Sequence, residues 1–274
     1  MSALVSTEWL AAHLNDVRVV DASWYMPEDK RDPAREFEAE HIPGAVFFDI
    51  DAISDKTTDL PHMMPEAEQF ARQLGALGIA DSDTVVVYDG AGIFSAPRAW
   101  WMLEAMGHKD VAVLDGGLPK WKREGRPLEQ GPAKAQTAHF TAKPDPALVR
   151  DFAQVKAALG NTQILDARSA SRFSGAEAEP RPGLKSGHMP AAVNVPWRSL
   201  LAPDNTLKDD HALQKLFAEK GVDLRAPIIT TCGSGISAAI IALALEKIGA
   251  RNLALYDGSW AEWGGRDDAA VEVG

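Results

Sequence analysis

The two halves of the chain carry the same short motifs in the same order. The matched pairs are VVDASWY (19–25) with ILDARSA (164–170), EHIPGAVFFDID (40–51) with GHMPAAVNVPW (187–197), VVVYDGAGIFSA (85–96) with IITTCGSGISA (228–238), and AVLDGGLPKWKREG (112–125) with ALYDGSWAEWGGR (254–266). Matched residues are 142 to 147 positions apart. A repeat that keeps its spacing over four motifs predicts two domains built alike.

Within each repeat, short β-branched runs alternate with longer stretches of helical periodicity. The runs expected as strands include Val85–Tyr88, Ile228–Thr231 and Leu253–Tyr256, and those expected as helices include Glu66–Leu77, Pro97–Met106, Ala212–Lys220 and Ser237–Ile248. This alternation predicts the α/β class, with each domain a mainly parallel sheet flanked by helices. The Pro- and Gly-containing stretch near residue 140 lacks periodicity, so we expect a first domain at 1–128, a linker at 129–144 and a second domain at 145–274.

Charge and cysteine content limit the function classes. The net charge is −11 and Lys and Arg do not cluster, which argues against nucleic acid or an anionic membrane as the main partner. The single cysteine excludes an intrachain disulfide and favours a reducing compartment, so we expect a cytoplasmic protein. No stretch has the roughly 18 apolar residues of a membrane span, and MSALVSTEWLAAHL does not resemble a signal peptide.

That cysteine, Cys232, lies in TTCGSGISAA between a predicted strand and a predicted helix. Ligands bind at this end of the strands in open α/β sheets. Gly233 and Gly235 allow a tight turn whose N–H groups point inward, and the following helix begins beside it, so the turn can stabilise a thiolate. The arrangement predicts a nucleophilic thiol.

A buried structural thiol is the ordinary alternative, because free cysteine is often a small core residue. The first repeat has Asp89 at the matching position, so the turn persists there without sulfur. A metal site is not expected, because neither C-x-x-C nor H-E-x-x-H spacing occurs. GAG at 90–92 lacks the third glycine of a dinucleotide-binding motif, and we expect no cofactor.

Taken together, the tandem repeat, the EHIPGA and GHMPAA corners, the cysteine turn and LYDGSWAEWG resemble the rhodanese-type sulfurtransferases over essentially the whole chain. The turn CGSGIS is similar to Cys-Gly-Ser-Gly-Val-Thr of the branch that uses 3-mercaptopyruvate, with Ile236 for Val and Ser237 for Thr. The thiosulfate branch carries Arg and Lys after the cysteine. The resemblance implies an inert first domain, a persulfide on Cys232, and delivery of sulfur to an external thiol, such as a thioredoxin, or to cyanide.

The resemblance also implies roles for individual residues. It implies catalytic roles for Cys232, Ser234, His62 and Asp51, the last three as a proton relay. It implies substrate contacts from Arg172 and Arg181, which would hold a carboxylate, and from the turn residues Gly233, Gly235, Ile236 and Ser237. His41 and His188 recur in both repeats, so we interpret them as structural residues of the corners.

Several alternatives stay open at this stage. Arg172 and Arg181 have Glu177 and Glu179 between them, which also fits a solvated charge cluster. A lone histidine such as His62 is more often structural, and Asp51 could cap a helix. A cysteine phosphatase would need an arginine near position 238, which is Ala. A thiosulfate sulfurtransferase and a non-catalytic persulfide carrier remain as rival functions.

Overall fold

The computed structural model describes residues 2–274, which form two compact units. Unit 1 consists of the chain up to Asp55 together with Met64–Asp145 and Ala202–Leu207. Unit 2 consists of Lys56–Met63, Pro146–Leu201 and Lys208–Gly274. Each unit therefore includes one short segment from the other half of the sequence.

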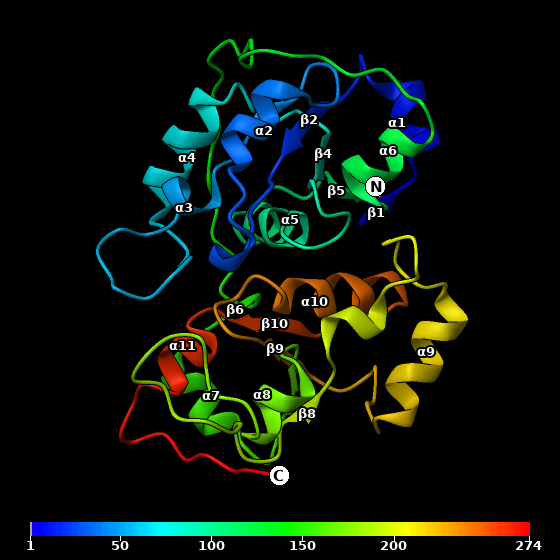
Figure 1. The fold of residues 1–274 in the computed structure, drawn as a ribbon. Helices are drawn as coiled ribbons and strands as arrows, with labels where there is room; N and C mark the ends of the chain where they lie inside the picture. The colour runs from blue at the N-terminus through cyan, green and yellow to red at the C-terminus, as the bar shows by residue number, and fades with distance from the viewer. Residues whose placement is uncertain (1) are drawn as a thin grey trace. The chain divides into compact units, whose positions relative to one another are not determined.

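Each unit is a five-stranded parallel sheet with helices packed around it (Figure 1). The elements of unit 1 are β1 (Leu4–Val5), α1 (Thr7–His13), β2 (Arg18–Asp21), η1 (Pro27–Asp29), α2 (Pro33–Ala39), β3 (Val46–Phe47), α3 (Ile50–Ile53), α4 (Ala67–Ala76), β4 (Val85–Tyr88), α5 (Ala96–Ala105), β5 (Val111–Leu114) and α6 (Gly117–Arg123). Those of unit 2 are β6 (Val149–Arg150), α7 (Phe152–Ala158), β7 (Gln163–Asp166), α8 (Ala170–Ser174), β8 (Val193–Asn194), η2 (Trp197–Leu200), α9 (Asp210–Glu219), β9 (Ile228–Thr231), α10 (Ala238–Lys247), β10 (Leu253–Tyr256) and α11 (Ser259–Trp263).

The strand orders show that the two units have one topology. The order is β1-β5-β4-β2-β3 in unit 1 and β6-β10-β9-β7-β8 in unit 2, and β4 and β9 are the middle strands. The predicted α/β class and parallel sheets are confirmed, and the strands expected from the β-branched runs have the predicted bounds. The helices expected from periodicity differ by one or two residues at their ends.

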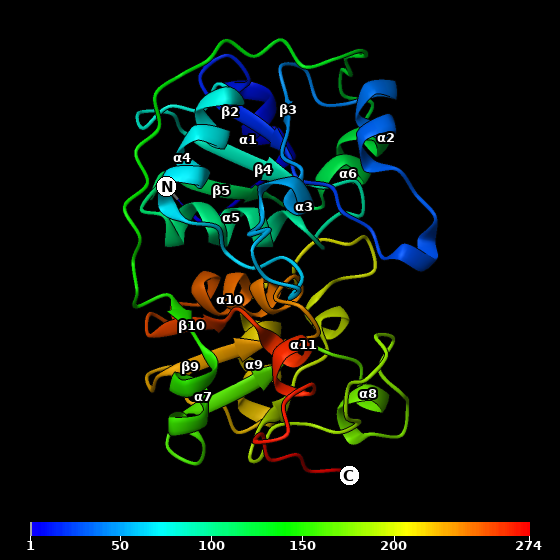
Figure 2. The same ribbon diagram turned by 90° about the vertical axis from the view of Figure 1, so that its left-hand side faces the viewer.

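Burial explains why β4, the middle strand of unit 1, carries no charged residue and consists of valines and a tyrosine. All four residues of β4 are buried, because a parallel sheet with helices on both faces leaves neither side of a middle strand in water. Val86 and Tyr88 pack into a cluster with Trp121 of α6, while α5 packs against β4 and β5 (Figure 2). The sheets therefore fix the positions at which β4 and β9 end, and the loops that follow these strands start from rigid supports.

The corner histidines make the same contacts in both units. The ring of His41 stacks on Phe37, with centroids 4.1 Å apart, and its Nδ1 lies 2.7 Å from the Phe37 carbonyl. His188 stacks on Phe173 at 3.8 Å and its Nδ1 lies 2.9 Å from the Phe173 carbonyl. The repetition supports the interpretation of both residues as structural.

The stretch expected as a linker packs on unit 1. The Ala138 N–H donates to the Gly75 carbonyl of α4 (2.9 Å), and the buried Phe140 contacts Phe70 edge-on. A Cβ at Gly75 would lie 2.6 Å from the Ala138 carbonyl oxygen, so only glycine allows this approach. This stretch lacks helical periodicity because it is extended chain that packs on α4.

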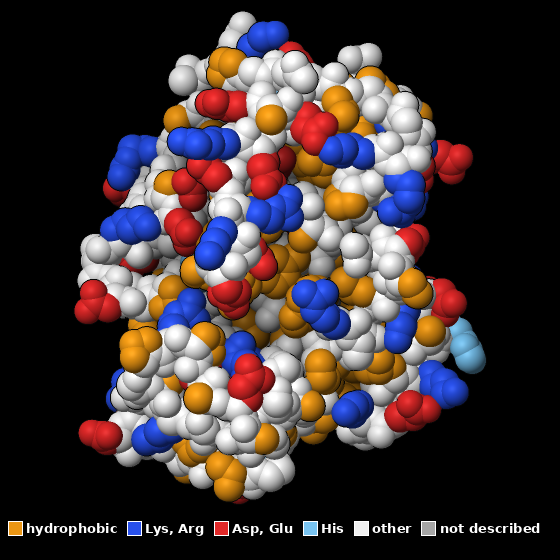
Figure 3. Space-filling model, viewed as in Figure 1, with side chains coloured by type: hydrophobic (Ala, Val, Ile, Leu, Met, Phe, Trp, Pro, Cys, Tyr) orange, Lys and Arg blue, Asp and Glu red, His pale blue; other side chains and the backbone are white. Residues whose placement is uncertain are grey.

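Charged side chains of both signs are interspersed on the face shown in Figure 3, and the net charge of −11 does not gather there into one acidic patch. Within residues 2–274, no helix combines the length and apolarity needed to cross a bilayer.

The units differ in how they compensate a buried aspartate at the end of an equivalent strand. In unit 2, Asp166 forms a buried ion pair with Arg168, whose Nη2 lies 2.6 Å from Oδ2. In unit 1, Ser23 takes the place of that arginine and donates to Asp21 through its N–H (2.8 Å) and its hydroxyl (2.5 Å). Burial without a cation raises the pKa of Asp21 from 3.8 to about 6, although the hydrogen bonds from Ser23 oppose the shift.

We expect Asp21→Asn to stabilise the protein at neutral pH relative to the native chain. In the native protein, the pKa of Asp21 is higher in the folded state than in the unfolded state, so the folded state binds this proton more tightly. The free energy of unfolding therefore falls as the pH rises from about 4 to 6. The free energy of unfolding of the native protein falls by about 3 kcal/mol in all, and about 2 kcal/mol of this lies between pH 4.5 and 7.5. Over that range, the free energy of unfolding of the variant, measured in urea, should therefore rise by about 2 kcal/mol relative to that of the native protein. Asp166→Asn is the matched control and should destabilise at both pH values, because it removes one of the two buried carboxylates that pair with Arg168. Parallel pH profiles for native protein and Asp21→Asn would contradict the prediction.

Candidate active site

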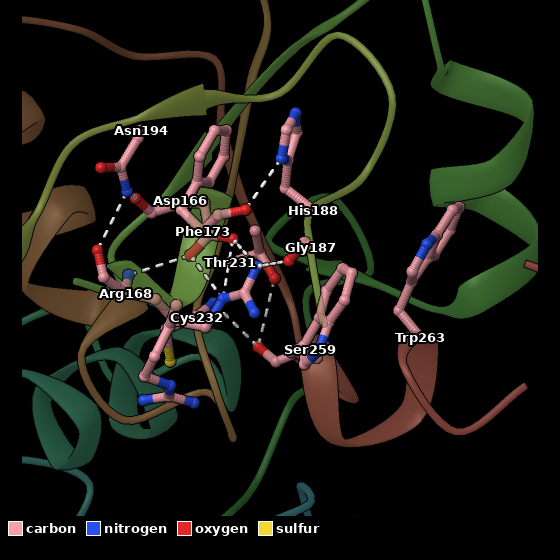
Figure 4. Close-up of polar contacts among 12 residues, drawn as sticks. Asp166, Arg168, Phe173, Gly187, His188, Asn194, Thr231, Cys232, Ser259 and Trp263 are labelled. Carbon is pink, nitrogen blue, oxygen red and sulfur yellow. Dashed lines mark hydrogen bonds and ion pairs between the residues drawn. The ribbon is translucent and has the colours of Figure 1, made fainter. Parts of the chain in front are cut away.

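Cys232 lies directly after β9, at the carboxyl end of the middle strand of unit 2 (Figure 4). Its N–H donates to the Ser259 hydroxyl (3.3 Å), and its carbonyl accepts from the N–H of Trp260 at the start of α11 (2.9 Å). The Gly233 carbonyl accepts from the Ala261 N–H in the same way (2.8 Å). The backbone on both sides of the thiol is therefore fixed, and the residue is 2% exposed.

The two glycines of the turn serve different purposes. Gly235 has φ +84°, a left-handed conformation that favours glycine, and its N–H points at the Cys232 sulfur, 3.1 Å from Sγ. Gly233 is not in that region, and its lack of a side chain serves packing. A Cβ there would lie 3.1 Å from Nη2 of Arg172. Gly233 thus admits a guanidinium beside the turn.

The equivalent turn of unit 1 shows what its backbone binds. The Asp89 carboxylate accepts five N–H bonds of 2.8 to 3.0 Å, which come from Ala91, Gly92, Phe94, Ser95 and Ala96. The carboxylate is fully buried and lies in the concavity formed by its own turn. This turn is an anion nest filled by a side chain of the protein.

In unit 2, the positions equivalent to those donors are Ser234, Gly235, Ser237, Ala238 and Ala239. Gly235 donates to the sulfur, and the Ala239 N–H donates to the Ile236 carbonyl (3.2 Å). Within the part of the chain that the structure describes, the N–H groups of Ser234, Ser237 and Ala238 have no acceptor. They lie where α10 begins, and the helix dipole also favours negative charge there.

His62 belongs to unit 2 and contacts the same turn. Its Nδ1 lies 3.1 Å from the Ser234 hydroxyl and 3.3 Å from the Ser234 carbonyl. The ring is 5% exposed, and the backbone of His62 has φ +61°, a strained value for a residue with a side chain. The fold holds His62 within hydrogen-bond distance of Ser234, the serine to which the family resemblance links it.

Asp51, the third residue of the predicted relay, belongs to α3 of unit 1. Its Oδ2 accepts a hydrogen bond from the indole N–H of Trp24 (2.9 Å). The cap of α3 is Asp49, whose Oδ1 accepts from the Ala52 N–H, so the alternative that Asp51 caps this helix is wrong. The role of Asp51 in proton transfer stays a prediction.

Arg172 is part of a buried ionic network, so the solvated charge cluster is the wrong interpretation for this residue. Its Nε and Nη2 lie 3.2 and 2.5 Å from the two oxygens of Glu179. Glu179 also accepts from Nη1 of Arg168 (2.8 Å), and Arg168 in turn pairs with Asp166 and lies 4.0 Å over the Trp260 ring. The side chains of Arg168 and Glu179 are 1% and 2% exposed and that of Arg172 is 17% exposed.

Arg181 differs from Arg172. It lies half-buried in the loop after α8, and among residues 2–274 it has neither an ion pair nor a hydrogen-bond partner. Its guanidinium is therefore available to an external anion.

Sequence reasoning missed three residues that fix the site, namely Arg168, Glu179 and Ser259. A signal existed for Arg168, because ILDARSA has arginine where VVDASWY has serine. For Glu179 the sequence shows only a charge between the two arginines. Ser259, which has φ +49° and a buried hydroxyl, gave no sequence signal, because its contact with Cys232 spans 27 residues.

A single thiol on a turn whose counterpart in unit 1 is an anion nest, with guanidinium and imidazole groups against the same turn, is suited to covalent transfer to and from sulfur. The rhodanese-like domain family matches residues 6–124 and 151–266, and the chain belongs to this family.

Known relatives match nearly the whole chain. It is 45% identical over 273 residues to 3-mercaptopyruvate sulfurtransferase of Escherichia coli, covering 98% of this chain and 97% of that one. It is also 44% identical over 271 residues to thiosulfate sulfurtransferase of Gallus gallus, covering 95% and 93%. The crystal structure of SseA from Escherichia coli, described among 3-mercaptopyruvate sulfotransferases, superposes with a TM-score of 0.87 at 41% identity, covering 95% of this chain and 99% of that chain.

Proposed function

We propose that this protein is a sulfurtransferase that moves sulfur from 3-mercaptopyruvate, through a persulfide on Cys232, to an external thiol or cyanide, with release of pyruvate. The observation that carries the proposal is the turn itself. The N–H groups of this turn hold a carboxylate in unit 1, and in unit 2 one of them, that of Gly235, donates to the only thiol of the chain. The relatives named as 3-mercaptopyruvate sulfurtransferases support the same assignment.

In the first step, the Cys232 thiolate attacks the sulfur of 3-mercaptopyruvate. An S–S bond forms, the C–S bond breaks, and its electron pair leaves with pyruvate as the enolate. The S–H proton of the substrate then moves to the enolate carbon, which gives pyruvate and a Cys232 persulfide anion. The N–H groups of Ser234, Ser237 and Ala238 stabilise the charge on the outer sulfur, as the equivalent groups do for Asp89.

The proton needs a carrier, because an enolate is a poor leaving group. Ser234 and His62 provide one in this proposal, since Ser234 is two residues after Cys232 and its hydroxyl lies 3.1 Å from Nδ1 of His62. With Nδ1 unprotonated, the ring accepts from the hydroxyl. With Nδ1 protonated, it donates to the hydroxyl oxygen or to the Ser234 carbonyl.

In the second step, an acceptor thiolate attacks the outer sulfur of the persulfide and restores the Cys232 thiolate. The chain has no second cysteine that could resolve the persulfide internally. The acceptor is therefore external, and we propose a thioredoxin-like protein, a small thiol or cyanide. A reducing, cytoplasmic location fits an unpaired catalytic thiol.

The arginines decide between the donors in this proposal. Arg172 and Arg181 hold the carboxylate of 3-mercaptopyruvate, for which a guanidinium edge offers two parallel N–H donors. Thiosulfate has no carboxylate, and Gly233 and Ser234 provide no cationic side chain that would hold it instead. Thiosulfate transfer is the second candidate, since the relative from Gallus gallus carries that name. A non-catalytic persulfide carrier would need neither arginine.

We expect the native protein to release pyruvate from 3-mercaptopyruvate and to use thiosulfate far less well. Arg172→Ala and Arg181→Ala should each lower kcat/KM for 3-mercaptopyruvate by about 10- to 150-fold, mainly through KM, because a charge-assisted hydrogen bond is worth about 1.5–3 kcal/mol. Steady-state kinetics with both donors make the measurement. Preference for thiosulfate in the native protein would overturn the donor assignment, and absence of turnover with either donor would leave the carrier function.

A further inference from the structure

Glu179 is the centre of the ionic network beside the cysteine turn. Its carboxylate is 2% exposed and accepts three hydrogen bonds from two arginines, one from Arg168 and two from Arg172. Arg168 has further partners in Asp166 and the Gly187 carbonyl (2.9 Å; Figure 4). Arg172 has no other charged partner among residues 2–274.

The contacts with Glu179 determine which edge of the Arg172 guanidinium faces the turn. Glu179 occupies the edge formed by Nε and Nη2, which leaves the edge formed by Nη1 and Nη2 for another carboxylate. A Cβ placed on Gly233 would lie 3.1 Å from Nη2 and 3.8 Å from Nη1, so this second edge lies against the residue that follows Cys232. The carboxylate of Glu179 therefore orients the guanidinium end beside the nucleophile.

Glu179 also sets the charge of the network. Asp166 and Glu179 carry two negative charges, and Arg168 and Arg172 carry two positive charges, so the four groups sum to zero. Without the Glu179 carboxylate the network would carry one net positive charge next to the turn. A compact dianion would gain from that charge, whereas a donor that relies on an aligned bidentate contact would lose the alignment.

We propose that Glu179 is a positioning residue that determines donor choice, because it aims Arg172 at the turn and cancels the charge of the network. This inference rests on the proposed function, in which Arg172 binds the donor carboxylate. Both effects act in one direction, toward 3-mercaptopyruvate and away from thiosulfate.

Glu179→Gln tests the inference with little change of shape. Arg168 keeps Asp166 and the Gly187 carbonyl, so the variant retains most of the buried network. An amide whose oxygen stays at the Oε1 position places its N–H donors against Nη2 of Arg172, which loses the stronger of its two bonds and is released from its orientation. We expect KM for 3-mercaptopyruvate to rise with kcat kept within about threefold, and the ratio of kcat/KM for 3-mercaptopyruvate to that for thiosulfate to fall by at least about tenfold.

Two further variants serve as controls. Glu177→Gln removes the same charge from the same loop, but at an exposed position. The Glu177 carboxylate accepts a hydrogen bond from the Ser171 hydroxyl and contacts no arginine, so this variant should leave the ratio of kcat/KM values unchanged. Glu179→Asp keeps the charge with a shorter reach and should give an intermediate ratio. A ratio for Glu179→Gln within twofold of that for Glu177→Gln would overturn the inference.

Crystal structures of Glu179→Gln and Glu177→Gln separate this inference from the proposed function. Arg172 should leave Gly233 in the first variant and remain beside it in the second. An unmoved Arg172 in Glu179→Gln overturns the positioning role, even in a protein that turns over no 3-mercaptopyruvate. A displaced Arg172 with unchanged KM would show that Glu179 orients Arg172 but would overturn its role in donor choice, and it would refute carboxylate binding by Arg172, which belongs to the proposed function.

Discussion

Cys232→Ser should abolish sulfur transfer and leave the fold intact. Cys232 is the only cysteine, so no other side chain can carry the sulfur between donor and acceptor, and we expect turnover to fall by about 10⁴-fold or more. A serine hydroxyl can still accept the hydrogen bond that Gly235 donates to the sulfur, and Ser259 and Trp260 hold the backbone as before. Pyruvate release from 3-mercaptopyruvate measures the loss.

Mass spectrometry of the intact protein adds a direct readout. After treatment with donor in the absence of acceptor, the native chain should gain the mass of one sulfur atom and the variant none. Equal unfolding midpoints for the two proteins show that the fold is unchanged. Turnover that persists in a folded Cys232→Ser protein would remove the thiol from the mechanism.

Asp89→Ala should destabilise unit 1 by at least about 4 kcal/mol without a comparable effect on the rate per folded molecule. The substitution leaves five N–H donors without their acceptor, three of them in buried hydrogen bonds, and each hydrogen bond to a charged group is worth about 1.5–3 kcal/mol. Urea unfolding measures the loss, and kcat is normalised to the folded fraction. Asp89→Asn should lose nearly as much, because its amide N–H₂ would face N–H donors.

A small anion should partly replace the missing carboxylate. Sulfate stabilises most proteins because it is excluded from their surface. The test therefore compares how steeply the unfolding midpoints of the variant and of the native protein rise with sulfate concentration. Unfolding midpoints of Asp89→Ala should rise more steeply with sulfate concentration than those of the native protein. Equal slopes would contradict the assignment of this turn as an anion nest, and a large loss of kcat in folded Asp89→Ala would give the Asp89 turn a catalytic role.

The sequence by itself determined the repeated α/β architecture and the position of the nucleophile. Both are encoded locally, because β-branched runs, helical periodicity and a Gly-rich turn after a strand each depend on neighbouring residues. The matched motifs also align Asp89 with Cys232. This alignment allows the contacts of the Asp89 turn to be used to interpret the cysteine turn.

Tertiary structure alone decided how the charges of the site are used. In the sequence, two glutamates, Glu177 and Glu179, lie between two arginines, Arg172 and Arg181, and nothing local distinguishes the members of either pair. Folding buries Glu179 between two guanidiniums and leaves Glu177 in water. The physical reason is that burial and ion pairing depend on partners distant in the chain, such as Gly233, which admits Arg172 only because it has no side chain.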